Sequence, residues 1–111
     1  MTYFITHGVR DDSLHEPFEA GTVQWVRRPG DGGREALSSG FWKVEPSQVP
    51  GPVDLVSHGD ETVHILEGKI LIEPVDGEPF TLTAGSVASF NDGARSRWTI
   101  LEPVVEFFVY S

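Results

Sequence analysis

The sequence contains no cysteine and few basic residues. None of its 111 residues is cysteine, which excludes disulfides, thiolate metal sites and cysteine nucleophiles. Lys and Arg number 8 against 17 Asp and Glu, so the formal net charge is −9. Nucleic acids and anionic membrane surfaces are bound through basic protein surfaces. We therefore expect neither a nucleic acid nor a membrane as a partner.

Long apolar runs are also missing. No stretch approaches the roughly 20 apolar residues of a membrane helix, and residues 1–7 lack the basic and apolar regions of a secretory signal. These absences, together with the lack of cysteine, predict a cytoplasmic protein. A chain of 111 residues, 39% of them hydrophobic, is long enough to bury the core of one domain.

Helical periodicity is absent, and turn-forming residues interrupt the chain throughout. There are 12 Gly and 8 Pro residues, and the short β-branched and aromatic runs between them predict strands. We place these strands at 2–6, 22–27, 41–45, 53–57, 61–66, 69–73, 80–83, 86–90, 96–101 and 104–110. Short, regularly spaced strands predict an all-β fold, either a barrel or a two-sheet jelly roll.

Glycine-containing pairs mark the expected hairpin turns. Residues 67–68, 76–77 and 91–93 each offer a glycine that accepts positive φ, as tight hairpin turns require. Residues 46–52 hold three prolines and therefore cannot form a central strand.

Two stretches of the chain resemble the signature motifs of the cupin family. The first, residues 58–68, places Glu61 seven residues before Gly68, as in the second half of the first motif. The second, residues 85–98, opens with the glycine of the second motif and supplies its next glycine at Gly93. The resemblance implies a cupin-type double-stranded β-helix, that is, a jelly-roll barrel.

The wider sequence is similar to one cupin subgroup, the ureidoglycine aminohydrolase-like single-domain cupins. The similarity includes the upstream run Gly-Phe-Trp-Lys-Val at 40–44. It implies one domain over 1–111, with N-terminal strands and loops at 1–39 and the cupin core at 40–110. It also implies a homodimer, in which a strand around 3–5 is exchanged or added at a sheet edge.

The resemblance implies a divalent metal inside the barrel, held in the family by three histidines and a glutamate. Only Glu61 stands in register for this set. The first two histidine positions fall on Asp54 and Val56, or one residue later, and the third falls on Ser96. Glu61, His58 and Asp54 are therefore the candidate ligands of manganese, nickel, iron or zinc. A hydrogen-bonded or solvated Glu61 without metal is the alternative.

Alternation along the strands decides which side chains line the interior. It places Glu61, Val63 and Ile65 inward and His64 outward. A tryptophan inside the barrel either stacks against a planar ligand or fills the core. The candidate ligand-binding residues are Trp42, Val56, Val63, Ser96 and Trp98.

Three functions remain open on these grounds. The first is a domain that binds a small polar metabolite with a weak or absent metal site, because the family histidines are missing. The second is a metal-dependent enzyme on a small nitrogenous or carboxylate substrate, as the resemblance to ureidoglycine aminohydrolase implies. The third is a structural or regulatory domain that acts through its dimer surface. Glu106 stands where the family typically has a lysine, a further departure from its pattern.

Overall fold

The computed structural model describes residues 3–111, and in this range nearly all regular structure is β-strand. The elements are η1 Asp12–Leu14, β1 Glu16–Pro17, β2 Thr22–Arg27, η2 Asp31–Gly33, β3 Ser38–Val44, η3 Pro46–Gln48, β4 Val53–Val56, β5 Glu61–Pro74, β6 Phe80–Thr83, β7 Val87–Phe90 and β8 Arg95–Tyr110. The three η elements are single 3-10 turns. None of the helices in residues 3–111 has the length and apolar character needed to cross a membrane.

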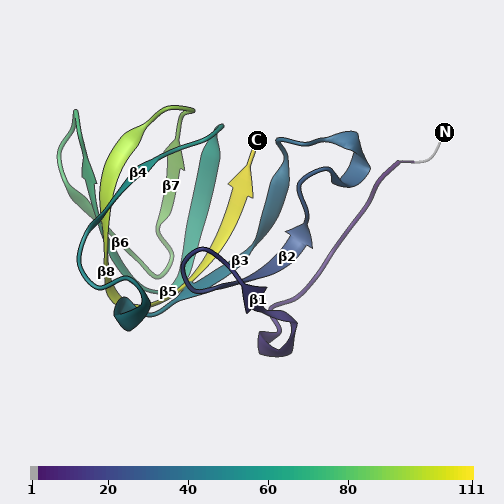
Figure 1. The fold of residues 1–111 in the computed structure, drawn as a ribbon, viewed down its shortest axis with the longest axis horizontal. Coiled ribbons are helices and arrows are strands. Elements are labelled where there is room, and N and C mark those ends of the chain that lie inside the picture. Colours follow the sequence, from purple (N-terminus) through teal and green to yellow (C-terminus); the bar gives the residue numbers. More distant parts are fainter. Residues whose placement is uncertain (1–2) are drawn as a thin grey trace.

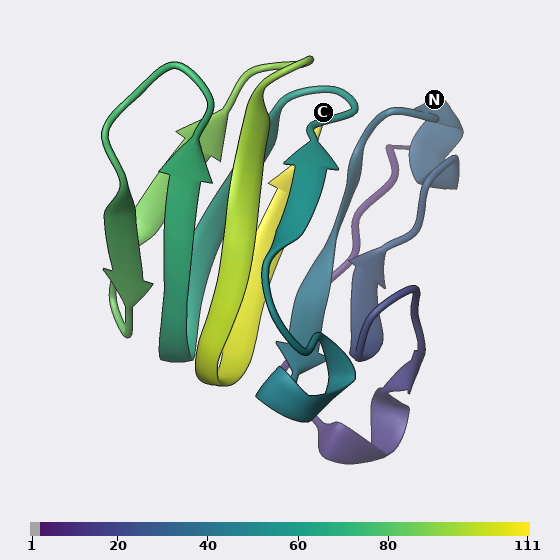
Figure 2. The same cartoon turned by 60° about the vertical axis from the view of Figure 1, so that its left-hand side comes forward.

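The two longest strands, β5 and β8, organise the sheet because each pairs with different neighbours along its length. The first part of β5 pairs with β7 and with the end of β8, whereas its second part pairs with β6 and with the start of β8. The start of β8 also pairs with β4, and its end pairs with β3, which leads on to β2 and β1. As a result the sheet folds into two layers: β4 and β6 lie in the layer on one side of the molecule, and β2 and β3 lie in the layer on the other side (Figures 1 and 2). The predicted all-β jelly-roll fold is confirmed.

Gly68 bends β5 from one layer to the other. The sequence predicted a hairpin turn at 67–68, and this prediction is wrong, because β5 continues through the glycine to Pro74. Gly68 has a φ of 98°, and the pairing with β8 shifts register on both sides of it. A Cβ at this position would lie 2.1 Å from the Pro103 carbonyl oxygen. Positive φ and close backbone approach thus serve a bulge here and not a chain reversal.

Residues 3–11 form an extended arm beside β2 and no strand. We expected a strand at 2–6, of which residues 3–6 lie in the described range. The side-chain amide of Gln24 donates to the Val9 carbonyl oxygen at 2.7 Å and accepts from the Asp11 N–H at 2.8 Å. Thr6 adds a hydrogen bond from its hydroxyl to the Val26 carbonyl oxygen. Side chains thus make the bonds that a backbone ladder would make in a strand.

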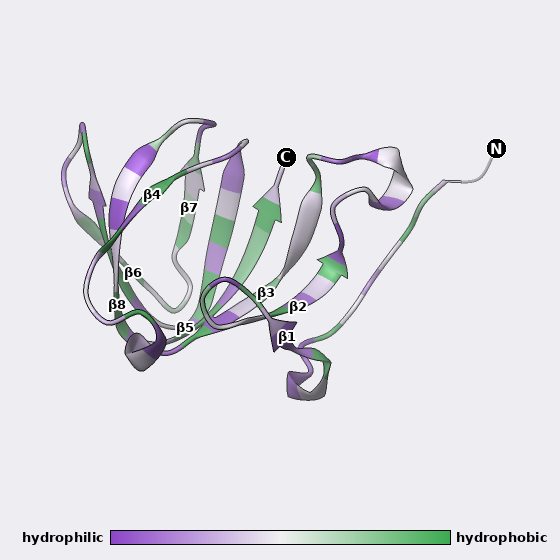
Figure 3. Ribbon diagram, viewed as in Figure 1, coloured by the Kyte–Doolittle hydropathy of each residue, from purple (hydrophilic) through white to green (hydrophobic). Residues whose placement is uncertain are grey.

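The core lies between the two layers. Along β5 the side chains of Glu61, Val63 and Ile65 are buried and that of His64 is exposed, as the alternation predicted. Figure 3 shows hydrophilic and hydrophobic residues alternating along this strand. Strand β2 contributes to this core through Val23, which is 0% exposed. Its buried apolar side chains are Val23, Val44, Val63, Ile65, Ile70, Ile72, Leu82, Phe90, Trp98, Ile100, Val104 and Phe108. Burial of this apolar area is the main force that holds the layers together.

Candidate functional site

The structure does not bring the three candidate metal ligands together. Glu61, at the start of β5, faces the interior and is 7% exposed. Asp54 is exposed on β4, where its carboxylate accepts a hydrogen bond from Arg97 Nε at 2.9 Å. His58 is exposed in the loop before β5. Within residues 3–111, no three His, Asp or Glu side chains are grouped so that they could hold a metal ion.

The interior face of the layer that contains β3 is built from rows of side chains that cross neighbouring strands. From one end to the other, the inward pairs between β8 and β5 are Tyr110–Glu61, Phe108–Val63 and Glu106–Ile65. Successive inward positions on a strand are about 6.6 Å apart. Two glutamates therefore lie in the outer rows, on adjacent strands, with an aromatic ring in the row between them.

Glu61 and Tyr110 form a hydrogen-bonded pair in which the Tyr110 hydroxyl donates to the Glu61 carboxylate. Burial raises the pKa of the Glu61 carboxyl, and the hydrogen bond from Tyr110 offsets part of that effect. Burial, together with the negative charge of Glu61, raises the pKa of the Tyr110 hydroxyl far above its usual value. Tyr110 therefore remains a protonated donor at physiological pH.

Glu106 is buried without compensation. Its side chain is 3% exposed, and its Oε1 atom has no hydrogen-bond partner within the described part of the chain. Its cross-strand neighbours are Trp42 and Ile65, and the Trp42 indole N–H is already donated to the Ala20 carbonyl oxygen at 2.6 Å. Burial, reinforced by the charge of Glu61, raises the pKa of the Glu106 carboxyl well above its ordinary value. A buried carboxylate of this kind is costly, which makes it a marker of function.

We call Glu61, Glu106 and Tyr110 the acidic centre. The neighbours that shift its pKa values are acidic or uncharged, and a further carboxylate, that of Glu19 in the β1–β2 loop, acts on Tyr110. The salt bridges of residues 3–111 lie at the surface and are Arg10–Glu67, Arg28–Glu16, Lys43–Asp12 and Arg97–Asp54. The interior negative charge thus has no basic counterpart of its own.

A line of aromatic rings runs from the β1–β2 loop to the acidic centre. The ring centroids of Phe18 and Trp25 are 6.0 Å apart, those of Trp25 and Phe108 are 5.9 Å apart, and those of Phe108 and Tyr110 are 5.4 Å apart. Gly40 of β3 lies between Trp25 and Phe108 in the sheet, and its missing side chain lets β2 approach closely, since a Cβ there would lie 2.5 Å from the Gln24 carbonyl oxygen. Trp25 and Tyr110 are half-buried, so the acidic centre is closest to solvent on this side.

The predicted ligand-binding residues mostly fill the interior. Val63 and Trp98 belong to the core, and the Trp98 ring packs 5.6 Å from that of a phenylalanine on β7. Trp98 donates its indole N–H to the Ser96 hydroxyl at 2.8 Å. Trp42 packs against the same core, whereas Val56 is 43% exposed on β4. Four of the five therefore face the interior, and Trp98 is packed within the core.

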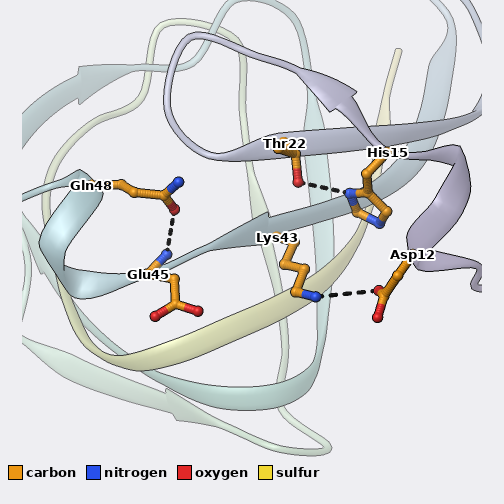
Figure 4. A pocket seen from close by; sticks show the side chains of 6 residues that line it. All are labelled: Asp12, His15, Thr22, Lys43, Glu45 and Gln48. Carbon is orange, nitrogen blue, oxygen red and sulfur yellow. Dashed lines mark hydrogen bonds and ion pairs between the residues drawn. The ribbon is translucent and has the colours of Figure 1, made fainter.

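A hollow of about 300 Å³ lies outside the barrel, between η1, β3 and η3 (Figure 4). Its polar groups are bonded to one another: His15 Nδ1 lies 2.9 Å from the Thr22 hydroxyl, Lys43 pairs with Asp12 at 3.3 Å, and the Glu45 N–H donates within η3. A second hollow, of about 320 Å³, lies beside the turns at 74–76 and 93–95. Neither hollow touches the acidic centre.

The chain matches the EutQ-like cupin domain over residues 32–108. It belongs to this family. The cupin shares 32% identity with a DUF861 family protein of Thermotoga maritima, over 61% of this chain and 73% of that one, with a TM-score of 0.54.

Two further solved structures share the fold of this EutQ-like cupin. A putative ethanolamine utilization protein Q of Salmonella typhimurium is 19% identical, over 92% of this chain and 83% of that one, with a TM-score of 0.69. Ectoine synthase of P. lautus is 15% identical, over 100% of this chain and 78% of that one, with a TM-score of 0.72. No curated protein sequence matches the chain.

The donors around Glu61 do not fit the metal that the cupin resemblance implied. Its partners across the strands are Tyr110 on β8 and Phe90 on β7. Neither carries an imidazole, and a single carboxylate is too small a donor set for a transition metal in a barrel. We therefore derive no chemistry through a metal ion.

Sequence reasoning found Glu61 but missed the rest of the acidic centre. It noted Glu106 only as a departure from a lysine, and Tyr110 only as the end of a strand. The signal was present in the alternation of the last strand, because Val104, Glu106, Phe108 and Tyr110 share one face. An acid on an inward, otherwise apolar face of a strand is a sequence signal for a functional site.

Proposed function

We propose that this EutQ-like cupin binds a small polar metabolite inside the barrel, at the acidic centre. The observation that carries the proposal is the Oε1 atom of Glu106, which is buried and has no partner within residues 3–111. Nearly all buried polar atoms in folded proteins are hydrogen-bonded. A ligand that donates a hydrogen bond to this oxygen supplies the missing partner.

The surroundings of the centre support a compact ligand. The Tyr110 hydroxyl donates to Glu61, and the half-buried Trp25 gives the nearest route to solvent. The apolar core packed around Trp98 limits the space deeper in the barrel. Small-molecule sites of this type combine apolar walls with a few polar groups that fix the orientation of the ligand.

The alternative function is a metal-dependent enzyme that acts on a small nitrogenous or carboxylate substrate, as in the ureidoglycine aminohydrolase-like cupins. It requires further metal ligands beside Glu61. Asp54 is engaged with Arg97 at the surface and His58 is exposed. The geometry therefore favours binding over metal-dependent catalysis.

A homodimer accompanies the proposed function. Its support is the exposed apolar arm, in which Tyr3, Ile5 and Val9 are 76%, 86% and 77% exposed and which a second copy of the chain would cover. Sedimentation should give a dimer for the wild type and a monomer for Ile5→Asp. The control Val75→Asp, at another exposed apolar residue, should leave the dimer intact. A wild-type monomer at 100 μM, roughly a hundred times a dissociation constant of 1 μM, would contradict the dimer.

A metabolite screen by thermal shift tests the proposed function. Isosteric Glu106→Gln removes the ionisable carboxyl of Glu106 from the centre, and Glu102→Gln removes an exposed carboxylate from the same strand. We expect at least one small metabolite to raise the melting temperature of the wild type and of Glu102→Gln but not of Glu106→Gln. A set of hits that stabilise all three proteins equally would place binding elsewhere.

A further inference from the structure

We propose that the ligand is an organic monocation, a primary or methylated ammonium compound, whose charged group lies over Phe108 between the carboxyl groups of Glu61 and Glu106. This inference rests on the proposed function and narrows it to one chemical class. It follows from the charge of the acidic centre, from the aromatic rings beside it and from the small number of oxygen atoms that could bind a metal ion.

The charge of the centre selects a cation. Glu61, Glu106 and Glu19 are the charged groups that act on Tyr110, and all three are acidic. They approach from β5, β8 and the β1–β2 loop, so the negative potential comes from more than one side. With no basic side chain among the groups that shift these pKa values, an anionic ligand would be repelled.

The aromatic rings select an organic cation over a metal ion. Phe108 lies in the row between the two glutamates, and its ring contacts those of Trp25 and Tyr110. Ammonium groups are attracted to the faces of such rings, and methylated ammonium groups, which lack strong hydration, most of all. A divalent cation instead needs six or more oxygen ligands or waters, and the described residues supply no group of three carboxylate or imidazole donors.

Hydrogen bonding gives the ammonium group its position. A primary ammonium has three N–H donors, and Glu106 Oε1 is a free, buried acceptor. Glu61 already accepts from Tyr110 and retains further lone pairs for a second contact. Charge-assisted bonds of this kind are short and strong. They therefore favour a primary ammonium when the ligand is compact enough to reach both carboxylates.

Binding should be linked to pH. The empty centre favours a protonated Glu106, because burial and Glu61 raise the pKa of that carboxyl. A cationic ligand favours the ionised form, so it must displace a proton when it binds. Affinity should therefore rise as pH increases from 5 to 8 and should level off once Glu106 is ionised in the free protein.

The experiment is a titration of the full chain that is monitored through the nuclear magnetic resonance signals of the three tryptophan indole N–H groups. Two of these tryptophans, Trp25 and Trp42, lie beside the acidic centre. The probes are ethylammonium and tetramethylammonium chloride, with ethanol, sodium acetate and magnesium chloride as neutral, anionic and divalent counterparts. An amine-free phosphate buffer at constant ionic strength avoids competition.

We expect saturable shifts of the Trp25 and Trp42 signals with an ammonium probe. The affinity should fall at least about tenfold in Glu61→Gln and Glu106→Gln and stay within twofold in Glu102→Gln. If ethanol or acetate binds with the same glutamate dependence, the ligand class is wrong and the proposed function stands. If magnesium alone does so, the ligand class is wrong and the metal alternative gains. If the binding of no probe depends on these glutamates, the inference is wrong. If the metabolite screen also gives no hit whose binding depends on Glu106, the proposed function is wrong as well.

Discussion

Replacement of Glu106 by methionine should stabilise the protein. Glu106 is 3% exposed, and its Oε1 atom lacks a partner within the described residues. Methionine is unbranched and of similar length, and it fills irregular core space without polar atoms. The substitution therefore removes the cost of an unpaired buried acceptor and adds apolar contact with Trp42 and Ile65, its cross-strand neighbours.

The size of the gain follows from the cost of an unsatisfied buried group, about 1–3 kcal/mol. With an unfolding entropy of roughly 2.1 cal/mol/K per residue, a chain of 111 residues shifts its melting temperature by about 4 °C per kcal/mol. We therefore expect Glu106→Met to melt about 4–13 °C above the wild type at pH 8. The exposed control Glu102→Met should change the free energy of unfolding by less than about 0.5 kcal/mol.

The gain should depend on pH. The pKa of the Glu106 carboxyl is raised in the folded protein from its ordinary value of 4.5, so the folded state holds a proton that the unfolded state has lost. The stability due to this proton is fully present below about pH 4.5 and is lost as pH rises through the folded pKa. Asp11 and Glu16 have lowered pKa values, and their contributions are already complete above pH 5.

Denaturant unfolding at pH 5, 6.5 and 8, followed by tryptophan fluorescence, measures these effects. The free energy of unfolding of the wild type should fall from pH 5 to pH 8, and Glu106→Met should remove most of that fall. The rest is due to Glu61, whose pKa is also raised by burial. A Glu106→Met variant less stable than the wild type at pH 8 would refute the cost assigned to the unpaired Glu106 carboxyl. The same dependence on pH in both proteins would refute it as well.

Three further predictions concern the bend, the core and the metal. Gly68→Ala should lower the free energy of unfolding by at least about 2 kcal/mol, because its Cβ would lie 2.1 Å from a backbone oxygen at a residue with positive φ. The control Gly77→Ala, whose Cβ would make only ordinary contacts, should change it by less than about 1 kcal/mol. Equal effects of the two substitutions in denaturant unfolding would argue against the bend at Gly68. Ser96→Ala should lower the free energy of unfolding by about 1–3 kcal/mol, because it leaves the buried Trp98 indole N–H unpaired. A loss below about 0.5 kcal/mol in the same denaturant assay would contradict this prediction. Manganese, nickel, iron(II) and zinc should shift the melting temperature of the wild type and of Glu61→Gln equally, and a shift lost only in Glu61→Gln would restore the metal site.

Local patterns predicted the strands well where turn-forming residues flank the strand at both ends. The strands at 22–27 and 80–83 have the predicted bounds, and the turns at 76–77 and 91–93 join strands as expected. Gly93 takes the predicted positive φ, whereas Gly77 does not. Gly68 shows where this reasoning ends. Positive φ suits both a hairpin turn and a bulge, and only the distant pairing of β5 with β8 decides between them.

The candidate site divides in the same way. Alternation along one strand was enough to place Glu61 inward. The position of Asp54 depends on the pairing of β4 with β8, which brings it beside Arg97 at the surface, and no local pattern contains that pairing. The importance of Glu106 depends on what does not surround it, namely a donor for Oε1, and a missing partner is visible only once the chain has folded.

The measurement that tests the central claim most directly is a carbon-13 titration of the Glu106 carboxyl, with and without ethylammonium chloride. In the free protein the account predicts a Glu106 pKa well above 4.5, because the group is buried and the charge of Glu61 acts on it. Saturating ethylammonium should lower that pKa, since the cation pairs with the carboxylate. An ordinary Glu106 pKa in the free protein, or one that the ligand leaves unchanged, would contradict the acidic centre as the binding site.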